Sequence, residues 1–201
     1  MSPPITRRLL LSGAAATGVA AAPPKQRVLL TTPGGNMTLL IHLDRAPLSG
    51  ADFLRYVDGG DYDGGRFFRV VRPDNDHGHP QIDVVQGGIR PGAKQGATVR
   101  HEPTSLTGLR HVDGAISLTR DAPGTGSGAE FFVCVGDQPA LDFGGTRNPD
   151  RQGFAVFGQV TDGMAVVRRI WGMAAGGVSE DRYTVGQILT RPVPILSARR
   201  I

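Results

Sequence analysis

The stretch that decides the fold is "GRFFRVVRPDNDHGHPQIDVVQGG", residues 65–88. Short runs of β-branched and aromatic residues stand near its two ends, and a polar, proline-containing loop joins them, which is typical of two strands. Strand alternation places Phe67, Arg69 and Val71 on one face of the first run. A charged side chain in such a run predicts either a buried structural ion pair or a functional group.

Further short apolar runs follow the same pattern through the chain. The first two flank the turn "PGGN" and predict a hairpin. One helix is expected at 48–60, with Ser49 as its cap, and a second from Asp162 in "DGMAVVRRIWGM". The remaining pattern predicts strands at 27–32, 37–43, 114–119, 130–136, 154–160 and within 184–198.

These elements predict a mainly β protein. Some eight strands with two helices favour a closed, eight-stranded antiparallel barrel capped by the helices. A β-sandwich is the competing architecture, because periodicity alone does not separate the two.

The amino-terminal residues have a different character. In "TRRLLLSGAAATGVAAAPP", Arg7 and Arg8 precede an uncharged run that ends at Ala22. This layout predicts an export signal over residues 1–22, too short and alanine-rich to span a bilayer stably. It is similar to a twin-arginine signal, with an ordinary secretory signal as the alternative. The domain at 23–201 is therefore expected to be periplasmic or secreted.

Composition narrows the range of partners. Without the predicted signal the net charge falls from +4 to +2, and no basic stripe with aromatic residues remains, so nucleic acid is not an expected partner. Cys134, the single cysteine, lies in an apolar run and is expected to be a buried hydrophobe. His77 and His79 suggest a metal site, but polar loop residues explain them better, and no metal or cofactor is expected.

Alternation also groups candidate functional residues. Gln86 shares a strand face with Val84, and Glu130 shares one with Phe132. If these strands lie near one another, they place a cation, an amide, a carboxylate and a phenyl ring around one shallow pocket. Arg69 is the strong hydrogen-bond donor of that pocket.

The runs "FFRVV", "VVQGG", "GAISLTR", "AEFFVCVGDQPALD" and "FAVFGQVTDGMAVVRRI" resemble, in this order, the signature segments of the cyclophilin-type peptidyl-prolyl isomerases. The resemblance covers about residues 27–199. No single segment is specific, but five in the same order are. The family implies an eight-stranded barrel with two helices and isomerisation of X–Pro bonds in proline-containing polypeptides.

The chemistry of that reaction explains a charged residue in the strand. Amide resonance opposes rotation with a barrier of about 18–20 kcal/mol, and no bond has to break. A protein therefore needs only to bind the twisted amide more tightly than the planar forms. The guanidinium of Arg69 is expected to donate a hydrogen bond to the proline nitrogen as it becomes pyramidal, which makes Arg69 the catalytic residue.

The resemblance implies a set of substrate-binding residues around Arg69. Phe132 would form the floor of the proline pocket, and Gln86 would orient Arg69 or hold a substrate carbonyl. The loop at 118–124 would grip the peptide through its backbone. The complete expected set is Gln86, Phe132, Leu141, Val84, Glu130, Phe154, Thr119 and Arg120.

Several residues depart from the family pattern. Asp83 replaces an aromatic residue, so one pocket wall is expected to be missing. Glu130 replaces a glutamine, and its carboxylate would either orient Arg69 or compete with substrate for it. Phe154 replaces a histidine. The segments 72–81 and 144–153 are longer than usual and would extend a groove.

Three functions remain open from the sequence. The first is an exported, monomeric isomerase that assists folding. The second is a non-catalytic proline-peptide binding module or chaperone on the same fold. The third is an unrelated barrel that binds a small ligand.

Overall fold

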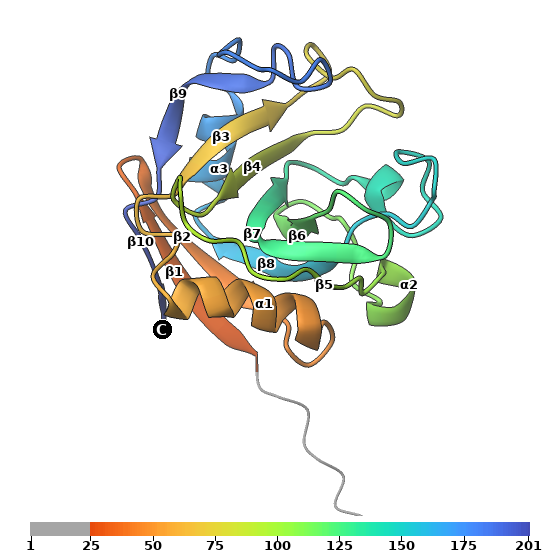
Figure 1. Ribbon diagram of the computed structural model, residues 1–201. Helices are drawn as coiled ribbons and strands as arrows, with labels where there is room; N and C mark the ends of the chain where they lie inside the picture. The colour runs from red at the N-terminus through yellow and green to blue at the C-terminus, as the bar shows by residue number, and fades with distance from the viewer. Residues whose placement is uncertain (1–24) are drawn as a thin grey trace, which may run out of the picture.

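The computed structural model describes residues 25–201, and the predicted export signal at residues 1–22 lies outside the described residues. Ten antiparallel strands in this part of the chain form one curled sheet (Figure 1), in the order β10-β1-β2-β8-β6-β7-β4-β3-β9, with β5 paired to β7. The strands are β1 (Gln26–Thr32), β2 (Gly35–Ile41), β3 (Arg66–Val71), β4 (Val84–Gly88), β5 (Val99–Arg100), β6 (Ala115–Thr119), β7 (Thr125–Cys134), β8 (Val156–Asp162), β9 (Ile188–Pro194) and β10 (Ser197–Arg200).

The predicted closed, eight-stranded barrel is wrong, because the sheet is an open, curled half-barrel. Its two outer strands, β9 and β10, are consecutive pieces of one segment. Between them, the N–H of Ile195 donates to the carbonyl of Gly65, and the N–H of Leu196 donates to that of Thr31. The chain thus passes from one edge strand of the sheet to the other, and β9 and β10 are not paired by backbone hydrogen bonds. Pro192 and Pro194 have no N–H to offer such a ladder.

In the described part of the chain, three α-helices flank the sheet, one more than predicted: α1 (Pro47–Asp58), α2 (Thr104–Thr107) and α3 (Met164–Trp171). Helix α1 packs on β7, β8 and β10, whereas α3 packs on β2, β3 and β4 (Figure 1). The missed helix, α2, is a single turn that ends at Gly108 with φ 66°. Within residues 25–201, no helix has both the length and the apolar content needed to cross a membrane.

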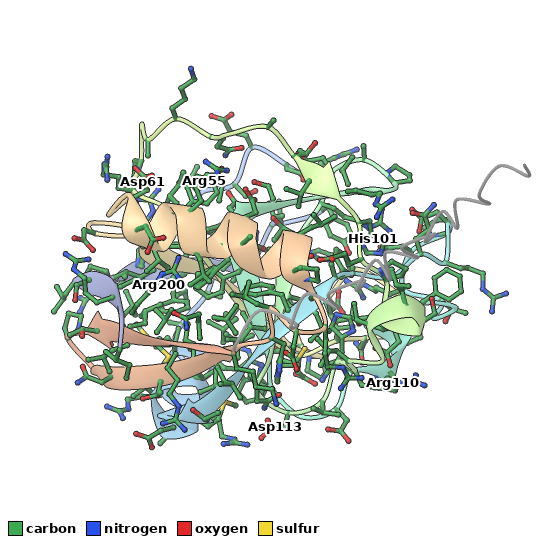
Figure 2. The ribbon with its side chains drawn as sticks, turned by 90° about the horizontal axis from the view of Figure 1, so that it is seen from below. Arg55, Asp61, His101, Arg110, Asp113 and Arg200 are labelled. Atoms are coloured by element: carbon green, nitrogen blue, oxygen red, sulfur yellow. The ribbon has the colours of Figure 1, made fainter. Side chains whose placement is uncertain are left out.

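The start of α1 differs from the prediction. Ala46 is the N-cap residue and makes no side-chain cap, and Ser49 lies buried within the helix. The carboxylate of Glu102 accepts the backbone N–H groups of Leu48 and Ser49 at 3.2 and 2.7 Å, and also the Ser49 hydroxyl. A distant carboxylate therefore satisfies the helix amino terminus. In Figure 2, Arg55 and Arg200 lie on opposite sides of this helix.

The core is an aromatic cluster between α1 and the sheet. Its ring centroids lie between 5.0 and 5.8 Å apart, and all its members are almost fully buried. Its members are Phe53, Tyr62, Phe67, Phe131 and Phe157. Cys134 is also buried, as expected, and burial raises the pKa of its thiol. Edge-to-face and tilted aromatic contacts of this kind make the sheet interior dense and apolar.

A β-bulge in β3 changes the predicted faces of that strand. The register against β4 shifts between Phe67 and Arg69, so Phe68 has no partner in the ladder. Phe67 therefore packs into the core against Phe131, and Arg69 lies on the other face of the sheet. The prediction that Phe67 and Arg69 share a face is wrong, since a bulge inserts one residue into the alternation.

Candidate active site

A row of side chains crosses four neighbouring strands at the candidate site. Arg69 of β3 pairs with Gln86 of β4, Gln86 pairs with Phe132 of β7, and Phe132 pairs with Ser117 of β6. Directly paired residues present their side chains on the same face of a sheet. Strand register thus brings together the cation, the amide and the phenyl ring that the sequence predicted.

Arg69 is held by two amides. Its Nη1 donates to Gln86 Oε1 at 2.9 Å, and its Nε and Nη2 both donate to Gln187 Oε1, at 2.9 and 2.6 Å. Gln187 is fully buried and is itself fixed by a hydrogen bond from its Nε2 to the carbonyl of Asn75 at 2.9 Å. The guanidinium is therefore oriented by rigid neutral acceptors.

Among residues 25–201, no carboxylate lies within salt-bridge distance of Arg69. Burial lowers the pKa of Arg69, and the nearby Tyr183 opposes this shift. The side chain stays cationic, since an arginine pKa begins far above neutrality. Arg69 is thus not the buried structural ion pair that the sequence left open as an alternative.

Glu130 contacts Arg69 through Gln86 and makes no direct ion pair with it. Its Oε2 accepts from Gln86 Nε2 at 2.8 Å, and this bond fixes which end of the amide faces Arg69. Burial raises the pKa of Glu130, and the hydrogen bond from Gln86 opposes the rise. Of the two roles expected from the sequence, the geometry matches orientation and not a direct competing ion pair.

All nine predicted site residues line one groove of about 330 Å³. Phe132 is nearly buried at its base, and the ring of Phe154 meets it edge-on at 5.3 Å. Val84 and Leu141 are buried beside the groove. The nine are Arg69, Val84, Gln86, Thr119, Arg120, Glu130, Phe132, Leu141 and Phe154.

The wall expected to be missing at Asp83 is supplied by its neighbour. Ile82, which is 8% exposed, lines the groove, whereas Asp83 is not among its lining residues. Burial raises the pKa of Asp83. The groove therefore keeps an apolar surface at this position, though an aliphatic one.

Arg120 supports the groove rather than offering a free charge. Its Nη2 donates to Asp150 Oδ1 at 2.8 Å, its Nε donates to the carbonyl of Gly153 at 2.8 Å, and its guanidinium lies 5.2 Å from the centre of the Phe154 ring. Thr119 donates weakly to the carbonyl of Glu130. Both Thr119 and Arg120 also line an adjoining depression of about 370 Å³ that continues the groove past the 118–124 loop.

A buried network supports Phe132 from behind. The ring of His111 stacks on Phe132 with centroids 5.9 Å apart. His111 Nδ1 lies 2.9 Å from Asp142 Oδ1, and its Nε2 lies 3.1 Å from Ser117 Oγ. All three polar residues are at most 5% exposed, and burial lowers the pKa of His111. The triad-like arrangement therefore positions Phe132 and offers no nucleophile to a substrate.

In the loop that carries His77 and His79, three side chains have other partners: Asp74, Asp76 and His77. The Asp76 carboxylate pairs with Arg147, Asp74 pairs with Arg72, and His77 Nε2 lies 2.8 Å from the carbonyl of Val185. Within residues 25–201, no three histidine, cysteine or acidic side chains gather closely enough to hold a metal ion.

Among the residues around the guanidinium of Arg69, sequence reasoning missed Arg147, Tyr183 and Gln187. The unusual length of 144–153 pointed to the segment that carries Arg147. Nothing pointed to Tyr183 or Gln187, because they lie more than a hundred residues from Arg69 along the chain. Only the path of the chain into β9 places them beside the groove.

Comparison with known proteins identifies relatives of one family. The sequence model of the family described as cyclophilin type peptidyl-prolyl cis-trans isomerase/CLD matches residues 27–199. The chain is 33% identical over 170 residues to peptidyl-prolyl cis-trans isomerase A of Dickeya dadantii, covering 83% of this chain and 80% of that protein. It is 32% identical over 152 residues to peptidyl-prolyl cis-trans isomerase B of Escherichia coli, covering 73% and 86%.

A solved structure shares the fold. A cyclophilin type peptidyl-prolyl cis-trans isomerase from Cryptosporidium parvum superposes with a TM-score of 0.66 at 16% identity, covering 89% of this chain and 98% of that one. The ordered sequence signatures, the row of site residues and these matches lead to one conclusion. The chain belongs to the cyclophilin-type peptidyl-prolyl cis-trans isomerase family.

Proposed function

We propose that this protein catalyses cis-trans isomerisation of X–Pro bonds in polypeptides, with Arg69 as the catalytic residue. One observation carries the proposal: in a groove with an apolar base, a cation is held by amides and not by a carboxylate. A guanidinium has five N–H donors, and the described residues accept three of them from Arg69. Two N–H groups thus remain for a substrate.

The reaction follows from this arrangement. The proline ring rests on Phe132, between Val84 and Leu141. As the amide twists, the proline nitrogen becomes pyramidal and gains a lone pair that Arg69 hydrogen-bonds. Since the planar amide offers no such acceptor, the interaction strengthens only near the transition state. One charged hydrogen bond gives about one to two decades of acceleration, and burial and pocket shape supply the remainder.

The test is exchange between proline isomers, measured by NMR on a short X–Pro peptide. We expect exchange broadening with the wild type and a loss of at least about tenfold in kcat/KM with Arg69→Ala. Arg69→Lys keeps the charge but loses the planar fork, so it should restore little. Unchanged exchange in Arg69→Ala would refute the role of Arg69.

The same measurement distinguishes an isomerase from the second function. A non-catalytic proline-peptide binding module or chaperone would give chemical-shift changes on peptide addition without faster exchange. This function keeps some weight because Asp83 and Glu130 differ from the family pattern.

We further propose that the protein acts as a monomer outside the cytoplasm, on newly exported polypeptides. The support is the signal-like sequence at 1–22 and the slowness of uncatalysed isomerisation, tens of seconds, which makes such help useful. Cell fractionation of a tagged protein tests the location, and light scattering tests the monomer. Retention of an Arg7→Lys/Arg8→Lys variant in the cytoplasm would identify the twin-arginine route, whereas continued export would favour an ordinary secretory signal.

A further inference from the structure

Three loops meet beside Arg69, and a buried ion pair joins two of them. Arg147, from 144–153, donates through Nη2 and Nη1 to the two carboxylate oxygens of Asp76, from 72–81, at 2.6 and 2.7 Å. Their side chains are 3% and 0% exposed. Arg147 Nη1 also donates to the carbonyl of Pro80 at 2.8 Å. A two-point contact of this kind fixes the geometry of both loops.

The third loop, 176–187, brings Tyr183 to this junction. Arg147 Nη2 donates to the Tyr183 hydroxyl at 2.7 Å, and the ring centre lies 5.7 Å from the guanidinium carbon of Arg69. The loop is tied to 72–81 by Asn75 Nδ2, which donates to the carbonyl of Gly186 at 3.1 Å. In Figure 1 the β3–β4 connection and the segment before β9 lie together at the top of the view.

Tyr183 is anchored and yet accessible. It remains 45% exposed, and it lines the groove together with Ile82 and Arg69. A large aromatic ring that is held in place at a groove wall is a pre-organised contact surface, which loses little entropy when a ligand binds.

The charged groups that line the groove leave no cation for an acidic ligand group beside the ring. Arg147 is neutralised by Asp76, and Arg120 by Asp150. The remaining cation of the lining is Arg69, which the proline amide engages. The Asp181 carboxylate accepts the N–H of Tyr183 at 2.9 Å, and its charge disfavours an acidic neighbour. The apolar surface at this place consists of the Tyr183 ring and the aliphatic Ile82, and the lining also includes Asn148 and Thr184.

Strand order fixes where such a side chain would lie. Thr119 ends β6 and Tyr183 precedes β9, and these strands lie at opposite ends of the path β6-β7-β4-β3-β9. The depression beyond the 118–124 loop shares four lining residues with the groove, Thr119, Arg120, Asp121 and Glu130, but it does not include Tyr183. A peptide centred on Phe132 therefore has one flank toward that loop and the other toward Tyr183.

We infer that Tyr183 is a specificity-determining residue that binds an aromatic side chain next to the substrate proline, on the flank turned away from the 118–124 loop. This inference rests on the proposed function and names the substrate class of the same groove. The aromatic side chain packs on the Tyr183 ring and on Ile82.

The test compares three short peptides that differ only beside the proline: phenylalanine before it, phenylalanine after it, or alanine at both places. NMR exchange gives kcat/KM, and chemical-shift titration gives the affinity of each peptide. We expect the wild type to prefer one of the two phenylalanine peptides over the alanine peptide by about tenfold. In Tyr183→Ala that ratio should fall to about twofold or less.

Two variants sharpen the result. Tyr183→Phe keeps the ring and should keep most of the preference. Val178→Ala changes an exposed apolar residue of the same loop, outside the groove, and should keep all of it.

Two outcomes would overturn the inference. One is a wild-type preference that survives in Tyr183→Ala, or no preference at all. The other is an equal loss on all three peptides, which would make Tyr183 only a support for Arg69. If the wild type accelerates exchange on no peptide, the proposed function fails, and the affinity ratios still decide the role of Tyr183.

Discussion

Arg69 and Arg147 both lie against the ring of Tyr183, at 5.7 and 5.9 Å, but they are held in opposite ways. Two amides hold Arg69, and burial lowers its pKa. A buried carboxylate holds Arg147 through two hydrogen bonds. Burial lowers the pKa of Arg147, but Asp76 raises it more, so that the net shift is upward.

The difference shows how one groove contains a structural and a functional cation. A carboxylate satisfies and neutralises a guanidinium, which then serves to join two loops. Amides orient a guanidinium and leave its charge for a substrate. In this molecule the choice of partner, rather than the depth of burial, separates the two arginines.

The largest expected effect comes from breaking the structural pair. Asp76→Ala leaves Arg147 buried without a counter-charge, and we expect the free energy of unfolding to fall by about 3–5 kcal/mol. Denaturant unfolding measures this loss. The double variant Asp76→Ala/Arg147→Ala should lose less than the sum of the two single variants, because the two residues act as one unit. A loss below about 1 kcal/mol in Asp76→Ala would show that the pair does not hold the loops.

The next prediction gives Arg69 a carboxylate partner of the kind that Arg147 has. Gln187→Glu places a carboxylate at the position that now accepts from Nε and Nη2 of Arg69, and neutralisation should lower kcat/KM about tenfold, or about 1.4 kcal/mol. Gln187→Leu removes the hydrogen bond to Asn75 and the acceptor of Arg69 without adding a charge, so it measures the cost of losing orientation alone. Wild-type kcat/KM in Gln187→Glu would refute neutralisation.

A third prediction concerns the pH dependence of stability. Glu130 and Asp76, the acids near the two arginines, change the free energy of unfolding with pH in opposite directions. Burial raises the pKa of Glu130 above its ordinary value near 4.5. An acid with a raised folded-state pKa contributes stability below its ordinary pKa, and this contribution is lost as pH rises through the folded value. Glu130→Gln removes that loss. As pH rises from 4.5 toward neutrality, the free energy of unfolding of the variant should therefore gain on that of the wild type.

Asp76 behaves in the opposite way. Burial raises its pKa, but Arg147 and backbone N–H groups lower it more, below the ordinary value near 3.8. The stability from this pair is therefore present above pH 3.8 and is lost as pH falls through the lower folded value. Denaturant unfolding across pH checks both signs. Parallel curves for the wild type and Glu130→Gln would contradict the shift at Glu130.

The smallest effect is expected at an exposed arginine. Arg168 pairs with Asp113, and both side chains are more than a third exposed. Figure 2 shows Asp113 at the edge of the molecule. Because water and salt screen such a pair, Arg168→Ala should change the free energy of unfolding by less than about 1 kcal/mol. A loss as large as that of Asp76→Ala would mean that burial does not explain the difference between the ion pairs.

Several features of the site followed from local sequence. Alternation within "IDVVQ" and "EFFVCV" placed Gln86 with Val84 and Phe132 with Glu130, and the ordered signatures supplied the neighbours of Arg69. The same reasoning failed at Phe67, where a bulge reverses the face, and at Ser49, where Glu102 satisfies the helix start from more than fifty residues away.

The sequence by itself determined the β class, the hairpin and two of the helices, because strand and helix periodicity are properties of neighbouring residues. The resemblance of its ordered segments to the family supplied the expected site set, whose nine residues are among those that line the groove. Only the tertiary structure decided that the sheet stays open, that Gln187 holds Arg69, and that Tyr183 stands beside it. Those contacts depend on strand register and on the path of the loops. Contacts between residues a hundred positions apart produce no periodic pattern in the sequence, so periodicity does not predict them.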